Sequence, residues 1–324
     1  MSTMTLLASL KTLEAKLRLL TPVSNVFHAE TIPGCAWARL AVGINGLALM
    51  LPKISEPTMA PVNLPNVAVR FNVRPQIEIE GSSTLEEIVF VETKSNEASV
   101  QRAFLDVVAM LLSSGRYGHA ADVRQLIEDF MELFRSLAGT PRNSALGLWG
   151  ELLTLSEARE KDLLIRAWHS SPNDRFDFSI GDLRFEIKTV IGPRVHHFSF
   201  EQIAPLPDVT ILIGSVVTTE DSEGPSIADL LDRVVGMTLD PNLKARAIKV
   251  AIASLGRDWT SHSELRFNES LAKSSLRWFS ASMVPQVGAP PIGVSAVNFI
   301  SDLQITSPIT VDDVDWGDVN RHFM

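Results

Sequence analysis

Residues 175–188, RFDFSIGDLRFEIK, constrain the fold of this chain more than any other part of the sequence. Apolar and polar side chains alternate on both sides of a central Gly-Asp pair, which is typical of a β-hairpin with one apolar face. A two-residue loop fixes the register, so Ile180 is predicted to oppose Leu183. Counting back from this pair, Asp177 is predicted to lie directly across from Glu186.

The two opposed carboxylates require a physical explanation. Facing residues of a hairpin have Cβ atoms roughly 4.5–5.5 Å apart, and like charges at that separation are destabilising. A divalent cation between Asp177 and Glu186 removes this repulsion, because hard cations favour carboxylate oxygens. Lys188 shares the same face and adds a positive charge beside the pair. We therefore expect a divalent-metal site on this hairpin.

Another carboxylate is predicted on the helix that precedes the hairpin. This helix is expected over about 145–162, with Asn143-Ser144 as its cap. Glu151 follows Leu148 by three residues and precedes Leu155 by four, which places it on or beside the apolar face. A carboxylate is costly to bury unless it is paired or bound to a metal. Glu151 is thus a candidate ligand, and the alternative is a boundary glutamate that reaches water.

The segment after the hairpin, RVHHFSFEQ at 194–202, carries further polar candidates. Arg194 is a candidate for a phosphate contact, and Gln202 opens a predicted short helix directed towards the site. His196 and His197 are adjacent, which does not suit two ligands on one face of a strand. Either histidine is explained as a structural residue, and His197 is kept as a candidate substrate contact.

The Glu-x-Lys spacing of Glu186 and Lys188 is a weak signal by itself. The same spacing occurs at Glu92-Thr93-Lys94, also at the end of an apolar run. That second occurrence lacks an aspartate on a paired upstream strand, so we interpret it as an exposed strand face. The combination with Asp177 on a hairpin is more specific.

The order of expected elements indicates two domains, a β-rich domain over 1–100 and a second domain over 101–324. A helix at 1–21 precedes short alternating runs and an Asn45-Gly46 hairpin signal. The acidic tail at 310–323 is interpreted as a solvated terminus. Strands are expected at 67–73, 76–80, 87–94, 209–217, 276–287 and 293–303, and helices at 96–113, 119–137, 200–206, 226–235 and 241–254.

Charge and composition limit the classes of function. The net charge of −9 argues against a surface built for non-specific nucleic-acid binding, but it leaves room for a local basic groove. The single cysteine, Cys35, excludes an intramolecular disulfide and a thiolate metal cluster. The chain has no signal-peptide pattern and no run of about 18 apolar residues, so we expect a cytoplasmic protein without a membrane segment.

The motifs together resemble the PD-(D/E)xK nuclease superfamily, which includes restriction endonucleases and many repair nucleases. The succession GLWGEL, RFDF, FEIKT and RVHHFSFEQ is similar in particular to a bacterial family of PD-(D/E)xK motif proteins that occur in phage-defence and restriction-modification gene clusters. These motifs cover about residues 140–220. Phe176 precedes Asp177 where the motif is named for a proline, a position that varies across the superfamily.

The resemblance implies an α/β protein with a restriction endonuclease-like αβββαβ core, a β-rich N-terminal domain and a C-terminal α/β extension. It implies that Asp177 and Glu186 bind Mg²⁺, with Mn²⁺ as a substitute, and that Glu151 completes the metal site. Lys188 would orient or activate the attacking water and stabilise charge on the phosphate. Gln202 matches a polar residue that some branches place near the site.

Three functions remain open at this stage. The first is a Mg²⁺-dependent DNA endonuclease of a restriction-modification or anti-phage system, with protein partners from its gene cluster. The second is a catalytically silent subunit of the same fold that binds DNA or acts as a scaffold, which the net charge of −9 and the β-rich N-terminal part favour. The third is a small-molecule enzyme. It is the least favoured, because the sequence contains neither a Gly-rich phosphate loop nor a Ser/His/Asp set. The sequence does not determine the recognition sequence, the choice between DNA and RNA, or whether the chain forms a homodimer.

Overall fold

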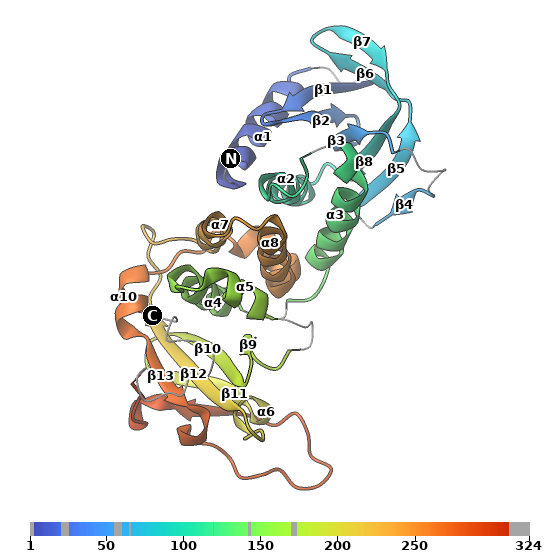
Figure 1. Cartoon of the computed structure of the whole chain (residues 1–324). Coiled ribbons are helices and arrows are strands. Elements are labelled where there is room, and N and C mark those ends of the chain that lie inside the picture. Colours follow the sequence, from blue (N-terminus) through green and yellow to red (C-terminus); the bar gives the residue numbers. More distant parts are fainter. Residues whose placement is uncertain are drawn as a thin grey trace. The chain divides into compact units, whose positions relative to one another are not determined.

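The chain forms two compact units, each assembled from two separate stretches of sequence (Figure 1). Unit 1 comprises Met1–Pro141 and Asp240–Thr260, and unit 2 comprises Arg142–Leu239 and Ser261–Met324. These compact units are not a test of the expected domain boundary near residue 100, which stays a prediction. The acidic tail from Val311 onward and the capping residue Asn143 lie outside the described residues. The structure is a computed structural model that describes residues 3–20, 26–54, 60–64, 66–118, 120–141, 144–169 and 174–310.

Unit 1 is built on an eight-stranded sheet with the strand order β4-β5-β8-β3-β2-β1-β6-β7. The described pairs are antiparallel except β1 with β6. The predicted Asn45-Gly46 hairpin is confirmed as β2–β3, with Gly43 paired to Gly46. The strands are β1 (Val26–Ile32), β2 (Cys35–Gly43), β3 (Gly46–Pro52), β4 (Val62–Asn63), β5 (Val67–Val73), β6 (Gln76–Ile79), β7 (Ser82–Leu85) and β8 (Ile88–Thr93).

Two helices of unit 1 pack against this sheet, and further helices pack against those two. The first helix buries Leu6, Leu10 and Leu17 on one face, and it contacts β1, β2 and the second helix. The third helix packs against the second and against the helix supplied by the later stretch of sequence. These elements are α1 (Thr3–Arg18), α2 (Ala98–Ser113), η1 (Ala120–Asp122), α3 (Val123–Leu137), α8 (Pro241–Leu255) and η2 (Gly256–Asp258).

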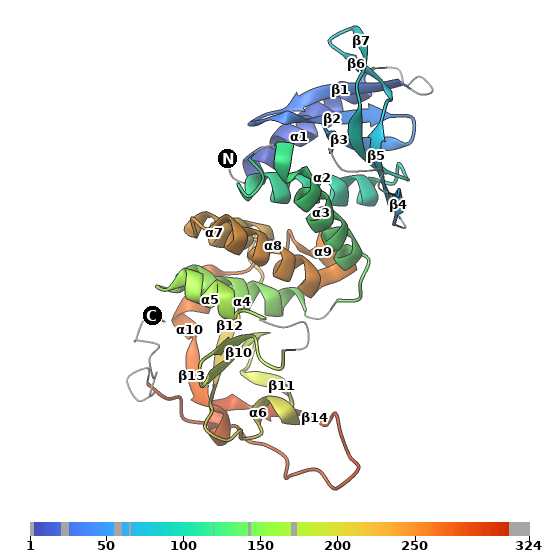
Figure 2. The same ribbon diagram turned by 45° about the vertical axis from the view of Figure 1, so that its right-hand side comes forward.

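Unit 2 contains a four-stranded sheet with the order β13-β12-β10-β9 and a two-stranded sheet of β11 and β14 (Figure 2). β10 and β12 are parallel, and the other pairs are antiparallel. Consistent with its continuous apolar sequence, β12 is buried from Ile211 to Val216. The strands are β9 (Phe178–Ile180), β10 (Leu183–Ile191), β11 (Val195–Ser199), β12 (Thr210–Thr218), β13 (Arg277–Ser280) and β14 (Asn298–Asp302).

The four-stranded sheet lies between a helical layer and the small second sheet. On one face α4 lies against β10, and α7 lies against α4. On the other face Ile213 and Phe279 share an apolar cluster with Phe198 of β11. The helices of this unit are α4 (Ala145–Glu157), α5 (Lys161–Ala167), α6 (Phe200–Ile203), α7 (Ile227–Met237) and α10 (Glu269–Ser275), with η3 (Ala281–Met283) and η4 (Leu303–Ile305); α9 (Trp259–His262) spans the boundary between the units.

The predicted α/β class is confirmed, and the described residues form three sheets, although several boundaries differ from the expected ones. The helix expected at 145–162 ends at Glu157, because Ala158 is extended, and a second helix begins at Lys161. The strands expected at 276–287 and 293–303 are shortened to β13 and β14. None of the described helices has the length and apolar character that a membrane-spanning segment needs.

A buried carboxylate joins three parts of unit 1. Asp129 of α3 is 2% exposed and accepts hydrogen bonds from Arg116 and Lys249 at 2.8 Å each, and from the hydroxyl of Tyr117. Burial alone would raise the pKa of Asp129, but the hydrogen bonds from Lys249 and Tyr117 lower it overall. The ionised carboxylate therefore holds α8 against α3.

We predict that Asp129→Asn destabilises unit 1 by about 2–3 kcal/mol. The loss is below that of a fully buried ion pair, because Arg116 and Lys249 remain partly exposed. The lowered pKa means that the contribution is complete above the ordinary aspartate pKa of about 3.9 and disappears as pH falls through the folded value. Calorimetric unfolding of the full chain should show this loss. Glu128→Gln, which removes an exposed pair with Arg124 on the same helix, should have almost no effect, and equal losses would contradict the prediction.

Candidate metal centre

The predicted hairpin register is confirmed by the pairing of β9 with β10. Ile180 pairs with Leu183, and Phe178 pairs with Phe185. Asp177 immediately precedes β9, and its Oδ2 atom accepts a hydrogen bond of 2.7 Å from the backbone N–H of Ile187. The hairpin thus brings the Asp177 carboxylate next to the backbone of Ile187, the residue after Glu186 in β10.

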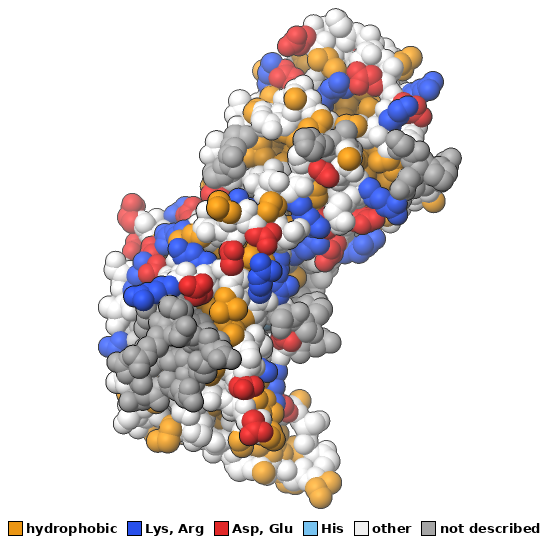
Figure 3. Space-filling model, viewed as in Figure 1, with side chains coloured by type: hydrophobic (Ala, Val, Ile, Leu, Met, Phe, Trp, Pro, Cys, Tyr) orange, Lys and Arg blue, Asp and Glu red, His pale blue; other side chains and the backbone are white. Residues whose placement is uncertain are grey.

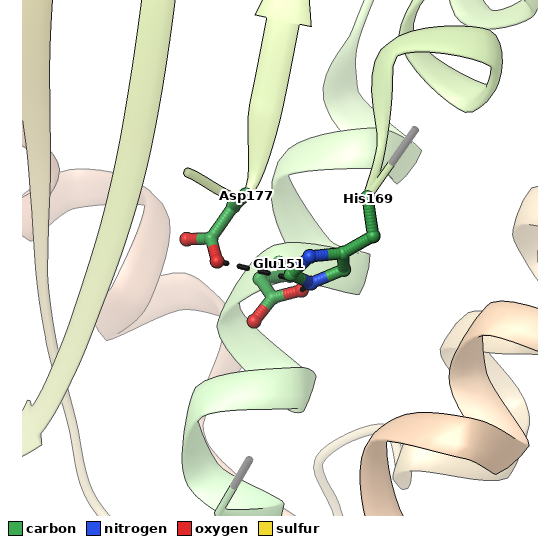
Figure 4. A group of neighbouring side chains, drawn as sticks. All are labelled: Glu151, His169 and Asp177. Atoms are coloured by element: carbon green, nitrogen blue, oxygen red, sulfur yellow. Dashed lines mark hydrogen bonds and ion pairs between the residues drawn. The ribbon is translucent and has the colours of Figure 1, made fainter. Parts of the chain in front are cut away.

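A group of three potential metal ligands lies at this end of the hairpin (Figure 4). Glu151 comes from α4, His169 from the segment after α5, and Asp177 from the start of the hairpin. One ligand atom of each lies within 4.8 Å of those of the other two. His169 Nε2 is 3.0 Å from Glu151 Oε2 and 3.8 Å from Asp177 Oδ1, so the imidazole bridges the two carboxylates.

The two residues after α5 fix Glu151 in place. Trp168 Nε1 donates a hydrogen bond of 2.7 Å to Glu151 Oε2, the same oxygen that His169 contacts. The backbone N–H of His169 donates to the carbonyl of Asp177 at 2.8 Å. His169 has a φ of 40°, a left-handed conformation that is uncommon for a residue with a side chain. Such local strain is frequent at functional sites.

Glu186 and Lys188 form an adjacent group with Gln202. Lys188 Nζ lies 2.7 Å from Glu186 Oε1 and donates to Gln202 Oε1 at 3.2 Å. The Gln202 amide also donates to Glu186 Oε1. Among the described residues, Glu186 Oε2 has no hydrogen-bond partner although it is buried. A buried carboxylate oxygen without a partner is costly, and a bound cation would satisfy it.

The local charges perturb the titration of several of these groups. Burial, followed by repulsion from Glu151 and Glu186, raises the pKa of Asp177 well above its ordinary value. Burial also raises the pKa of Glu186, although Lys188 opposes the change. Burial alone would lower the pKa of His169, but its hydrogen bond to Glu151 raises it overall. These shifts are the electrostatic signature of acidic groups gathered without enough positive charge.

The donor set fits a divalent cation. Asp177 Oδ1 and Glu186 Oε2 are carboxylate oxygens that the hairpin does not use in hydrogen bonds, and hard cations prefer such oxygens. Glu151, His169 and Asp177 together offer two carboxylates and one imidazole. The carboxylates suit the Mg²⁺ expected from the sequence or Mn²⁺, whereas an imidazole suits Zn²⁺ or another transition metal. The residues thus support a metal site without selecting one ion.

The other polar candidates of the sequence occupy different surroundings. Arg194 donates 2.8 Å hydrogen bonds to the carbonyl and the hydroxyl of Ser215, and it also donates to the carbonyl of Ser275. His196 is buried, and its Nε2 atom lies 2.7 Å from Ser215 Oγ. Burial, and after it the positive charge of Lys188, lowers the pKa of His196 to about 4. His197 is exposed on β11. A phosphate contact by Arg194 or a substrate contact by His197 stays a prediction.

Sequence reasoning did not identify His169. This residue lies on an irregular segment between α5 and β9, where no periodic pattern assigns a face. The available signal was local: the Trp168-His169 pair lies directly after α5 and shortly before the acidic hairpin.

Comparison with known protein families assigns the chain to one family. It belongs to the DUF4420 family, described as "Putative PD-(D/E)XK family member", whose model matches residues 43–268. Comparison with curated proteins and with solved structures found no match.

We predict that Asp177→Asn stabilises the metal-free protein and abolishes stabilisation by a divalent cation. The amide keeps an acceptor for Ile187 N–H but removes one charge from the acidic group, and ion-binding sites commonly trade stability for function. Thermal unfolding would be measured in EDTA and in excess Mg²⁺ or Mn²⁺ at mildly alkaline pH. Saturating metal should stabilise the unsubstituted chain by about 2–4 kcal/mol.

The matched control is Asp182→Asn at the exposed turn of the same hairpin. This variant should keep the metal-induced shift and should not gain stability in EDTA. An undiminished metal-induced shift in Asp177→Asn would contradict the assignment of Asp177 as a ligand.

Proposed function

We propose that this chain is a metal-dependent nuclease that hydrolyses phosphodiester bonds of DNA with Mg²⁺, or Mn²⁺ in its place. The observation that carries the proposal is the convergence of Glu151, His169 and Asp177 from three separate segments beside the Glu186-x-Lys188 strand. Membership of DUF4420 supports the same class of protein. The chain order α4, α5, β9, β10, β11, α6, β12 also supports a restriction endonuclease-like core, although α5 is an additional helix and β11 pairs with β14 and not with the four-stranded sheet.

Asp177, Glu186 and Glu151 would hold the metal ion, with His169 as a further ligand or as the group that orients Glu151. A bound divalent cation would lower the pKa of a water molecule and stabilise charge on the phosphate. The buried position of Asp177 and Glu186 suits this role, because electrostatic interactions are stronger where water is excluded.

Lys188 would act on the attacking water and on the phosphate oxygens. Its ammonium lies 2.7 Å from Glu186 and 5.3 Å from the centre of the Phe198 ring, so several groups restrict its position. Gln202 supports both residues, since its amide contacts Glu186 and its carbonyl oxygen accepts from Lys188. From this position the compact ammonium would contact a substrate oxygen that lies beside Glu186.

The cellular role follows from the resemblance to defence-associated proteins and is part of the proposal. We infer a restriction or anti-phage function, with DNA as the substrate and proteins of the same system as partners. A catalytically silent subunit of this fold is the competing function. It would keep the metal site yet show no cleavage alone or with its partners.

We predict that purified protein nicks or linearises plasmid DNA in Mg²⁺ or Mn²⁺ and that Lys188→Ala lowers the rate by about 100-fold or more. Loss of one group that stabilises charge in the transition state typically has an effect of this size. Metal binding, measured by titration calorimetry, should remain, because Lys188 is not a ligand. Gel assays of initial rates provide the comparison.

Lys94→Ala is the control, because Lys94 repeats the Glu-x-Lys spacing in unit 1 and donates a hydrogen bond of 2.8 Å to the carbonyl of Leu64. It should cleave at the unsubstituted rate. Metal-dependent cleavage that survives in Lys188→Ala and in Asp177→Asn would have to come from a contaminant or another site, and it would refute the proposal.

A further inference from the structure

An uncharged loop projects from unit 2 between η3 and β14. Residues 278–301 contain no Asp, Glu, Lys or Arg, although the whole chain is 21% charged. In Figures 1 and 2 the loop extends away from β14 and α6, and in Figure 3 hydrophobic side chains lie at the end of this projection. Ile292 is 107% exposed, and Val287 and Val294 are also exposed. Exposed apolar side chains gathered on one segment indicate a binding function.

The tip of this loop has a defined turn. Val294 N–H donates a hydrogen bond of 3.0 Å to the carbonyl of Pro291, which closes a four-residue turn. Gly293, with φ of 89°, occupies the position that requires the left-handed region in a type II turn. Pro290 and Pro291 restrict the chain just before it. The turn thus presents Ile292 to solvent at little further cost in conformational entropy.

The base of the loop is fixed to the helix that carries Gln202. Ser301 Oγ donates to the carbonyl of Pro285 at 2.7 Å, which ties the two ends of the loop together. The N–H of Phe200, at the start of α6, donates to the carbonyl of Val297 at 2.8 Å. Two residues later in α6, Gln202 contacts Glu186 and Lys188 of the candidate centre. The loop and the candidate centre therefore share one structural support.

We propose that residues 285–297 form a wedge that inserts Ile292 between base steps of duplex DNA. The inference rests on the proposed function. An uncharged projection avoids the repulsion that the net charge of −9 imposes elsewhere, and isoleucine and proline are among the side chains that proteins use to unstack base pairs. His197 and Ile300 are paired and exposed on β11 and β14, which continues a neutral surface from the loop base.

A short duplex that carries 2-aminopurine at several positions tests this wedge, because the fluorescence of this base rises on unstacking. Binding would be measured in Ca²⁺, a larger cation than Mg²⁺ with looser coordination, to separate binding from cleavage. We expect the unsubstituted chain to raise the fluorescence. Ile292→Ser should lose most of this rise and bind about tenfold more weakly, since the polar side chain no longer gains from burial.

The matched control is Ile305→Ser, at an isoleucine that is 78% exposed in the same unit but lies after β14. It should retain both the affinity and the fluorescence rise. Equal signals from Ile292→Ser and the unsubstituted chain, or no duplex binding by the unsubstituted chain, would overturn the wedge. Sedimentation that shows self-association lost in Ile292→Ser would instead assign the loop to a second copy and also overturn it.

Cleavage measured on the same preparations separates this inference from the proposed function. An Ile292-dependent fluorescence rise without metal-dependent cleavage would support the wedge and refute the nuclease. Cleavage by the unsubstituted chain without such a rise would support the nuclease and refute the wedge.

Discussion

The burial of three carboxylates around β10 is the constraint on which the arrangement of unit 2 depends. Glu151, Asp177 and Glu186 are 1%, 7% and 4% exposed, and an ionised group so placed needs compensating partners. Those partners come from different parts of the chain, since Trp168 and His169 follow α5, Ile187 N–H belongs to β10, and Gln202 belongs to α6. A shift of any one of these segments would leave a buried carboxylate without compensation, so the acidic groups fix the positions of the elements around them.

Close packing of α4 on the sheet places Glu151 among these groups. Gly150 lies so near β10 that a Cβ atom there would overlap Thr189 Oγ1, so a side chain at this position would push the helix away. Gly214 of β12 is also enclosed, because Ile187 and Trp278 of the two neighbouring strands occupy the space that a Cβ would need. The position of Glu151 therefore depends on the absence of a side chain at its neighbour, as well as on its own spacing in the helix.

The sequence predicts the regular parts of this site and misses the irregular ones, for physical reasons. Alternation in the hairpin and the spacing of Glu151 from Leu148 report which side chains share a face, and the structure confirms the hairpin register and the burial of Glu151. His169 lies where no periodicity applies. The apolar residues between β13 and β14 resemble strand sequence, yet Pro285, Pro290 and Pro291 cannot donate to a sheet, and the segment stays a loop.

The division of unit 1 into two stretches has a consequence for the order in which the chain can fold during synthesis. One of the two cations that compensate Asp129 is Lys249, and the N–H of Arg257 donates at 3.1 Å to the carbonyl of Gly139. Both groups leave the ribosome only after Arg142–Leu239, the first stretch of unit 2. During that interval α3 lacks its partner helix α8, so the packing of unit 1 can be completed only after the first stretch of unit 2 has been synthesised.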